Sequence, residues 1–311
     1  MTEFHHVSVL LEECIDGLNI KPDGIYVDGT LGGAGHSSRI AAKLTTGHLI
    51  GIDRDEIALE AAARRLEPYK DRVTLVHSNF CEIASVLKQL CIDGVDGILL
   101  DLGVSSPQLD DGSRGFSYMA DAPLDMRMDN TDTLTAATVV NTWPYEELKR
   151  ILYDYGEERY APQIASAICR KREQKPIATT LELVDVIRSA MPPAALREKQ
   201  HPAKRSFQAI RIAVNDELGA VEKVMRDAVP CLNPGGRLAV ITFHSLEDRI
   251  VKNAMAEAAK GCTCPPNFPV CVCGKKPKVK LVTRKPIVSG DEELERNPRA
   301  RSAKLRICEK L

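Results

Sequence analysis

The amino-acid sequence predicts an α/β protein with a doubly wound, seven-stranded, Rossmann-like sheet and a small inserted helical domain. Three observations lead to this prediction. Short apolar runs that end in Asp28, Asp53 and Asp101 alternate with alanine-rich helical patterns, as in repeated βαβ units. A glycine-rich turn follows the first of these runs. A long stretch with a helical pattern then separates the fourth predicted strand from the fifth.

Composition narrows the class of protein. The 311 residues are enough for about two domains, and 44% hydrophobic with 27% charged residues is ordinary for a globular protein. No apolar run is long enough to span a membrane, and the first residues lack the pattern of a signal peptide. We therefore expect a cytoplasmic protein without a membrane partner. Ten cysteines in that compartment favour metal binding or burial over disulfides.

Residues 25–38 read IYVDGTLGGAGHSS, which predicts a strand, a tight turn and the start of a helix. Four glycines let a ligand approach bare backbone in this turn: Gly29, Gly32, Gly33 and Gly35. Asp28 disfavours a pyrophosphate but can accept a hydrogen bond from an amino group, so the turn suits an adenosine that carries an amino acid. The alternative is a turn that only connects strand to helix.

The next strands end in further polar or aromatic residues. The run HLIGID ends at Asp53, 25 residues after Asp28, where a carboxylate can bind both ribose hydroxyls of a nucleoside. The predicted strand 72–77 is followed by Asn79 and Phe80, which could hold an adenine ring, although Phe80 could simply cover the core. The run GILLD ends at Asp101. Because parallel strands share one carboxyl edge, we expect these residues to lie at a common rim.

The remaining chain predicts the domain organisation. Residues 102–130 fit neither strand nor helix, and residues 135–190 are helical in pattern. We expect an inserted helical domain at residues 108–205, and a discontinuous sheet domain at residues 1–107 and 206–311. Late strands near 279–283 and 303–308 could form an antiparallel edge pair. Seven strands with such a reversal are typical of a methyltransferase sheet rather than a six-stranded dinucleotide fold.

Several longer motifs resemble the RsmH/MraW family. They are DGTLGGAGHS (28–37), GIDRD (51–55), GILLDLGVSSPQLDD (97–111), RGFSYM and PLDMRM (within 114–128), YGEERYA (155–161), HPAKRSFQAIRIAVNDEL (201–218), GGRLAVITFHSLEDRIVK (235–252) and NPRARSAKLR (297–306). The resemblance covers nearly the whole chain. It implies an S-adenosylmethionine-dependent methyltransferase that acts on the N4 amine of a cytosine in the decoding region of 16S ribosomal RNA. The implied partner is this RNA or the assembled small subunit, with no obligate protein partner.

The resemblance also implies site residues. The cofactor contacts that it implies are Gly33, Ala34, Gly35, His36, Asp53, Phe80, Asp101 and Gln108. Cytosine N4 is a poor nucleophile, so the site must hold the amine with hydrogen-bond acceptors in near-attack geometry. Asp101 is the predicted catalytic residue and orients the amine, together with the backbone of residues 104–107.

Three further side chains have both a catalytic and a structural interpretation. His244 ends a predicted buried strand and could accept a proton, but histidines at strand ends more often have a structural role. Phe116 and Tyr118 could stack on a cytosine that has left its helix, or could pack the loop onto the inserted domain.

The segment GCTCPPNFPVCVCG contains Cys262, Cys264, Cys271 and Cys273 in two C-x-C pairs. Four thiolates can hold a tetrahedral zinc ion, but a one-residue gap strains both ligands. The alternative is a proline-rich lid whose cysteines are merely packed. We therefore assign no metal ligand from the sequence and keep both interpretations open.

Basic clusters at residues 197–211, 275–285 and 296–306 indicate contacts with a polyanion, although each could be a solvated face. Two other functions remain open at this point. An NAD-dependent oxidoreductase shares the glycine-rich turn and the position of Asp53, but the glycine spacing is G-x-x-G-G-x-G instead of G-x-G-x-x-G. A non-catalytic RNA-binding assembly protein could keep a cofactor pocket.

Overall fold

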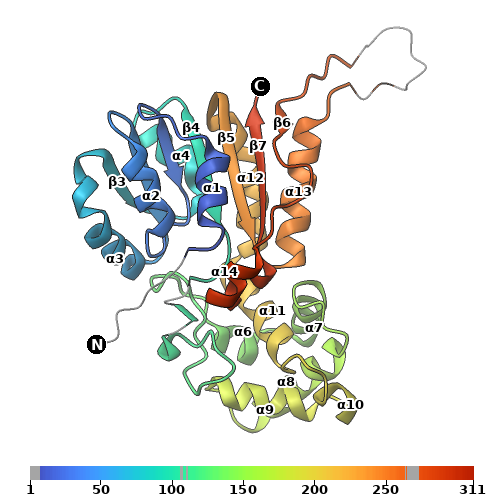
Figure 1. Cartoon of the computed structure of the whole chain (residues 1–311). Coiled ribbons are helices and arrows are strands. Elements are labelled where there is room, and N and C mark those ends of the chain that lie inside the picture. Colours follow the sequence, from blue (N-terminus) through green and yellow to red (C-terminus); the bar gives the residue numbers. More distant parts are fainter. Residues whose placement is uncertain (1–7, 106–107, 110, 263, 265–272) are drawn as a thin grey trace. The chain divides into compact units, whose positions relative to one another are not determined.

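The structure is a computed structural model of the whole chain, and it describes all residues except 1–7, 106–107, 110, 263 and 265–272. Two compact units divide the chain. The sheet unit comprises Met1–Gly103 and Leu218–Leu311, and the helical unit comprises Val104–Glu217. Figure 1 shows the elements of both units.

The sheet unit contains a seven-stranded sheet, which confirms the predicted fold class. The strands are β1 (Ile25–Asp28), β2 (His48–Asp53), β3 (Val73–His77), β4 (Val95–Asp101), β5 (Leu232–Thr242), β6 (Val279–Leu281) and β7 (Lys304–Lys310). Their order is β3-β2-β1-β4-β5-β7-β6. Neighbours among β1 to β5 are parallel, whereas β7 is antiparallel to both β5 and β6. The antiparallel edge pair that the sequence predicts is therefore present.

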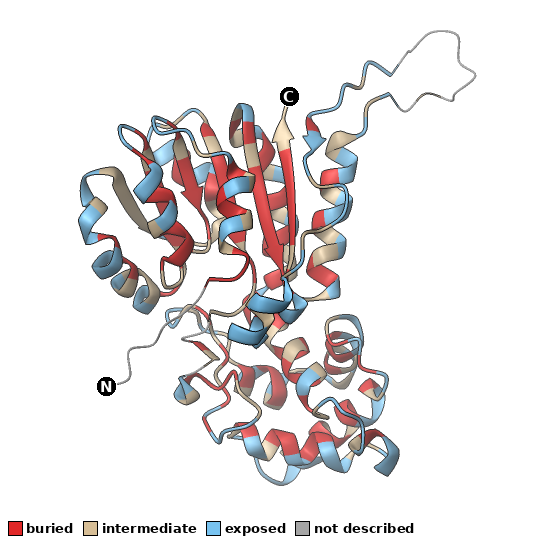
Figure 2. Cartoon of the chain, viewed as in Figure 1, coloured by how far each residue is buried: buried red, intermediate tan, exposed pale blue. Residues whose placement is uncertain are grey.

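Helices lie on both faces of the sheet. They are α1 (Leu11–Leu18), α2 (Gly35–Lys43), α3 (Glu56–Leu66), α4 (Ile83–Gln89), α12 (Glu217–Cys231), α13 (Ser245–Ala259) and α14 (Asp291–Arg296), with 3-10 turns η1 (Glu67–Arg72), η2 (Phe80–Glu82) and η4 (Pro298–Ser302). Successive side chains of a strand point to opposite faces of the sheet, so an apolar strand such as β4 needs helices packed on both faces. Ile98 and Leu100 enter the core with α4, α12 and α13, while Leu99 enters the core with α1, α2 and α3. Figure 2 shows the resulting buried strands in red.

The register brings the carboxyl ends of the parallel strands to one edge. Asp28 pairs with Gly51 of β2 and Leu99 of β4, and Asp101 pairs with Ile241 of β5. The turns that leave these strands therefore start side by side.

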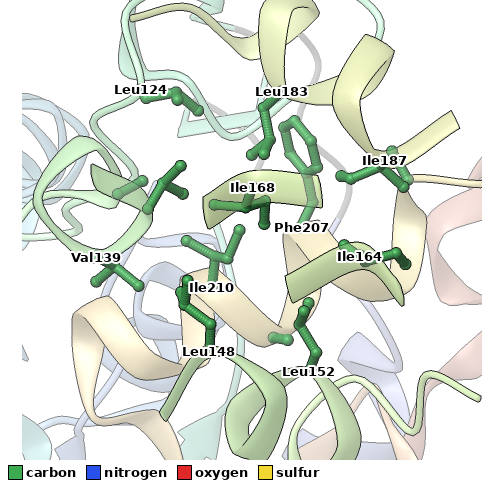
Figure 3. Packing of buried hydrophobic residues seen from close by; sticks show 14 of the residues in the cluster. Leu124, Val139, Leu148, Leu152, Ile164, Ile168, Leu183, Ile187, Phe207 and Ile210 are labelled. Atoms are coloured by element: carbon green, nitrogen blue, oxygen red, sulfur yellow. The ribbon is translucent and has the colours of Figure 1, made fainter. Parts of the chain in front are cut away.

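The helical unit has its own core. Its helices are α6 (Ala136–Thr142), α7 (Tyr145–Asp154), α8 (Ala161–Gln174), α9 (Thr180–Ser189), α10 (Pro193–Leu196) and α11 (Lys204–Asn215), and η3 (Gly112–Arg114) lies in the preceding loop. Figure 3 shows Ile164, Ile168, Leu183 and Ile210 packed together in this core. Among the described residues, no helix combines the length and apolar character that a membrane span requires.

The boundaries of the units differ from those predicted. The sequence analysis placed them at 107/108 and 205/206, whereas the chain divides at 103/104 and 217/218. The larger difference comes from α11. Phe207 and Ile210 on this helix are buried in the helical core, so the whole helix belongs to the helical unit. An amphipathic pattern indicates that one face is buried but does not tell which core covers it.

Candidate active site

The turn after β1 is held open by contacts with its neighbours. Gly32 has φ +47° and Ala34 has φ +55°, so two residues of the turn are in the left-handed region. The Gly32 amide donates to Asp53 Oδ2 at 2.7 Å, and Arg65 donates to the Gly33 carbonyl at 2.9 Å. These bonds fix the path of the backbone before any ligand binds.

Two glycines of this turn have different surroundings. A Cβ built on Gly33 meets no atom within 4 Å, so open space lies beside this residue. A Cβ on Gly35 would lie 1.8 Å from Ser8 Oγ, because the N-terminal segment crosses the start of α2 there. Gly33 therefore borders the space that a ligand could fill, while Gly35 is required by packing within the protein.

Asp28 is a structural residue of the turn. It is 1% exposed, its Oδ1 accepts the Thr30 amide at 3.2 Å, and its Oδ2 accepts the Ser37 hydroxyl at 2.7 Å. Burial raises the pKa of Asp28 to about 6, although both hydrogen bonds oppose the shift. Both oxygens accept hydrogen bonds from the turn and the side chain is almost fully buried, so the structure favours a structural role for Asp28. Its contact with a ligand's amino group stays a prediction.

Asp53 lies at the end of β2 and supports the turn from the other side. Its Oδ2 accepts the Gly32 amide, and its Oδ1 accepts the Asp55 amide at 2.9 Å. Burial is the main cause that raises the pKa of Asp53. A carboxylate has about four acceptor positions, so two backbone donors leave capacity for ribose hydroxyls. Its role in cofactor binding stays a prediction.

Asp101 is the carboxylate with an unused oxygen. Its Oδ1 is buried and has no hydrogen-bond partner among the described residues. The Asp101 amide donates to Thr30 Oγ1 at 2.5 Å, which ties the end of β4 to the glycine turn. Burial, reinforced by the negative charges of Asp28 and Glu247, raises the pKa of Asp101 to about 8. At neutral pH the carboxyl therefore carries a proton in the unliganded protein.

His36 faces this carboxyl from α2. Its Nε2 lies 3.0 Å from the Val9 carbonyl, which can only accept, so Nε2 carries the hydrogen of this bond. The other ring nitrogen, Nδ1, lies 3.8 Å from Asp101 Oδ2. His36 is 5% exposed, so its role at the rim comes from its position beside Asp101 rather than from contact with solvent.

Phe80 begins η2, directly after β3. It packs partly buried against the core that contains α4, and its Cβ is 3.1 Å from the position of a Cβ built on Gly29. Asn79 Oδ1 accepts the Cys81 amide at 3.1 Å and caps the 3-10 turn. The structure therefore places Phe80 beside the glycine turn, and its proposed contact with adenine stays a prediction.

His244 and Glu247 lie at the start of α13. His244 Nε2 is 3.1 Å from Glu247 Oε1, and Glu247 Oε2 accepts the Phe243 amide at 3.0 Å. Both ring nitrogens of His244 are nevertheless buried without a hydrogen-bond partner among the described residues, so the catalytic and the structural interpretations both stay predictions. The sequence analysis did not single out Glu247, which is 1% exposed and helps to raise the pKa of Asp101. Its position three residues after the helix cap was the available signal.

The other predicted residues belong to the helical unit. Gln108 is 6% exposed, and its Oε1 accepts the Ser105 amide at 3.1 Å, while residues 106 and 107 of the predicted acceptor backbone lie outside the described residues. Phe116 is 6% exposed within the helical core, which favours the packing interpretation. Tyr118 stacks on His201 with ring centroids 4.6 Å apart.

The basic cluster at residues 296–306 is partly used within the protein. Arg306 donates to Asp248 Oδ1 at 2.7 Å, and the Lys304 ammonium lies 3.2 Å from Asp248 Oδ2. These ion pairs lower the pKa of Asp248 against the opposing effect of burial. Arg301 is exposed and keeps its side chain in solvent. The cluster therefore offers fewer cations to a polyanion than its sequence indicates.

Comparison with known proteins identifies the family. The model of the MraW methylase family matches residues 3–311. The chain belongs to this family. A ribosomal RNA small subunit methyltransferase H from Brevibacillus brevis is 60% identical over 309 residues, which cover 99% of this chain and 98% of the relative. Proteins with the same name from Heliobacterium mobile and a Paenibacillus species are 57% and 59% identical, and cover 99% of this chain and 100% of each relative.

A solved rRNA methylase from Streptococcus thermophilus aligns with 98% of this chain and 99% of its own, at 10% identity and a TM-score of 0.44, which is too remote to bear on function. Family membership makes the protein a methyltransferase with S-adenosylmethionine as methyl donor, and confirms the resemblance seen in the sequence. The oxidoreductase alternative is therefore wrong.

Proposed function

We propose that the protein methylates the exocyclic N4 amine of a cytosine in the decoding region of 16S ribosomal RNA, in the cytoplasm. The names of the relatives support an RNA of the small ribosomal subunit as the substrate. The observation that carries the chemistry is Asp101, whose side chain is 24% exposed and whose Oδ1 is buried without a hydrogen-bond partner among the described residues, beside the glycine turn. Buried polar groups are normally satisfied, so an unsatisfied one at a rim indicates that its partner is a ligand.

The residues of the rim fit the methyl donor. Gly33 borders open space, and the backbone of residues 33–36 would bind the amino-acid part, as the resemblance implies. Asp53 would accept the ribose hydroxyls, and Phe80 would cover one face of the adenine. When bound, S-adenosylmethionine supplies an electrophilic methyl group on a positively charged sulfur.

Asp101 would act on the acceptor amine. A cation near this carboxyl favours its ionised form, so a pKa of about 8 falls when the donor binds and the proton leaves Asp101. The resulting carboxylate accepts a hydrogen bond from the amine and turns the nitrogen lone pair toward the methyl group. Formation of the nitrogen–carbon bond would leave the electron pair of the broken carbon–sulfur bond on sulfur, and the methylated nitrogen would release one proton to solvent.

The helical unit is the proposed site of substrate recognition. Among its cations, Lys171, Arg197 and Lys199 are exposed. Exposed cations outside ion pairs are suited to phosphate contacts, which position an RNA without reading its sequence. The contact of Gln108 with the cofactor, which the resemblance implies, stays a prediction.

A methyl-transfer assay tests this function. Small subunits from a strain that lacks the modification are incubated with the enzyme and S-adenosylmethionine, and the nucleosides are analysed by mass spectrometry. We expect N4-methylcytosine to approach one equivalent per subunit. The same reaction on free 16S ribosomal RNA tells whether the assembled subunit is the substrate. A methyl group on a different nucleoside would contradict the proposed acceptor, and no transfer to either substrate would favour an RNA-binding assembly protein.

A further inference from the structure

Two described arms lie between α13 and β6, one after the end of α13 and one before the start of β6. Figure 1 shows both arms projecting from these elements. The arms are joined at their base, because the Lys278 amide donates to the Ala258 carbonyl at 2.8 Å. The next residue, Val279, is buried in the core at 1% exposure. The arms are therefore anchored at their base.

Three cysteines from the two arms lie close together. The sulfur atoms of Cys262, Cys264 and Cys273 are all within 4.8 Å of one another. The sulfurs of Cys262 and Cys273 are 3.6 Å apart across the two arms. The Cys264 amide donates to Cys262 Sγ at 3.4 Å. Cys271, the fourth cysteine that the sequence analysis considered, lies outside the described residues.

We propose that Cys262, Cys264 and Cys273 form a binding site for a structural zinc ion. Four sulfurs at about 2.3 Å from zinc in a tetrahedron are roughly 3.8 Å apart, close to the separation across the arms. A backbone amide that donates to a cysteine sulfur stabilises the thiolate form, which is the form that binds metal. Each zinc–sulfur bond forms as the thiol loses its proton to solvent.

Burial argues against the alternative that these cysteines are merely packed. Cysteines that act as small apolar residues are buried, as Cys14 and Cys308 are at 0% exposure. Cys262 and Cys273 are exposed instead, so apolar packing does not explain why their sulfurs gather.

The charge of the neighbouring residues also favours thiolates. Lys275, Lys276 and Lys278 follow Cys273 in the sequence, and Lys275 forms an ion pair with Glu257 of α13. A zinc ion with three thiolates has a net charge of −1, which is opposite in sign to the charge of this basic stretch. The ion would clip the two arms together and hold this basic stretch in a fixed conformation.

Metal analysis of the full chain tests the proposal. The protein is purified under reducing conditions without added zinc, and its zinc content is measured by mass spectrometry. We expect about one equivalent in the wild type and less than about 0.1 in the triple variant C262S/C264S/C273S. The matched control is Cys91→Ser, which changes an exposed cysteine elsewhere and should keep the metal.

Two further measurements keep the test independent of methyl transfer. Cobalt(II) added to the metal-free wild type should give thiolate-to-metal charge-transfer absorption, which the triple variant should lack. Circular dichroism should show that the triple variant keeps the secondary structure of the sheet unit. Wild-type protein that holds less than about 0.1 equivalents, and does not take up zinc when it is supplied, would overturn the proposal. Equal metal content in the wild type and the triple variant would also overturn it.

Discussion

The ends of β1 and β4 differ although they are neighbours in the sheet. Both strands end in an aspartate, and Asp28 pairs with Leu99, two residues before Asp101. Asp28 is 1% exposed, whereas the Asp101 side chain is 24% exposed. Asp28 gives both oxygens to Thr30 and Ser37, within its own turn. Asp101 Oδ1 has no hydrogen-bond partner in the part of the chain that the structure describes, and the pKa of Asp101 is raised to about 8, compared with about 6 for Asp28.

The different hydrogen bonding of Asp28 and Asp101 indicates that one has a structural role and the other a chemical role. A buried carboxylate whose two oxygens both accept hydrogen bonds stabilises the turn that donates them. A buried carboxyl without a partner makes the folded protein less stable than a satisfied one would, and such a group persists where a ligand supplies the missing bond. We therefore propose that Asp28 stabilises the glycine-rich turn and that Asp101 orients the acceptor amine.

The largest expected effect is a loss of methyl-transfer rate when the Asp101 carboxyl is removed. Asp101→Ala should lower the single-turnover rate of methyl transfer by about 10²- to 10³-fold, because the amine loses the acceptor that orients it. Affinity for S-adenosylmethionine, measured by calorimetry, should change by less than about tenfold. The thermal unfolding profile should show that the variant folds. A rate within about threefold of the wild type would refute the role of Asp101.

Removal of the Asp28 carboxyl, at the end of β1, is expected to lower the stability of the protein. Asp28→Ala should lower the free energy of unfolding by about 1–3 kcal/mol, because the Thr30 amide and the Ser37 hydroxyl lose their acceptor. Ser37→Ala is the milder control and should lose about 1 kcal/mol. Denaturant titration checks both values. An Asp28→Ala variant as stable as the wild type would mean that the turn does not depend on this carboxylate.

Much of this arrangement could be predicted from the sequence. Aspartates that end parallel strands must meet at one edge, so the pattern placed Asp28, Asp53 and Asp101 at a common rim. It could not show that Asp28 is satisfied, because that depends on the path of the turn, which brings Ser37 back to the carboxylate. The burial of Phe116 was also beyond prediction, since an irregular loop has no periodicity that tells which side chains face a core.

Substitutions of Gly33 and Gly35 are expected to have different effects, although both residues belong to the same turn. Gly33→Ala should weaken the binding of S-adenosylmethionine at least about tenfold with unchanged stability, because its Cβ would enter open space that the ligand needs. Gly35→Ala should instead destabilise the protein by about 1–3 kcal/mol, through the clash with Ser8. Calorimetry and denaturant titration measure the two effects. If both variants lost only stability, the space beside Gly33 would not be the cofactor site.

The smallest expected effect is a pH dependence of stability. A carboxyl whose pKa is raised by folding contributes its stability below its unfolded pKa, and that contribution is lost as the pH rises through the folded pKa. Between pH 6 and 8 the wild type should therefore lose stability relative to Asp101→Asn, by at most about 1.4 kcal/mol per pH unit. Parallel denaturation curves across this range provide the measurement. A difference that does not vary with pH would show that Asp101 does not titrate there.

The most direct test is a titration of both carboxyls in one sample. In protein labelled with ¹³C at the aspartate carboxyls, NMR should give a pKa of about 8 for Asp101 and about 6 for Asp28, with each signal assigned from its asparagine variant. Addition of S-adenosylmethionine should lower the pKa of Asp101 far more than that of Asp28. A pKa of Asp101 near the ordinary value of about 4, or one that does not change with the methyl donor, would contradict the proposed division between the two residues.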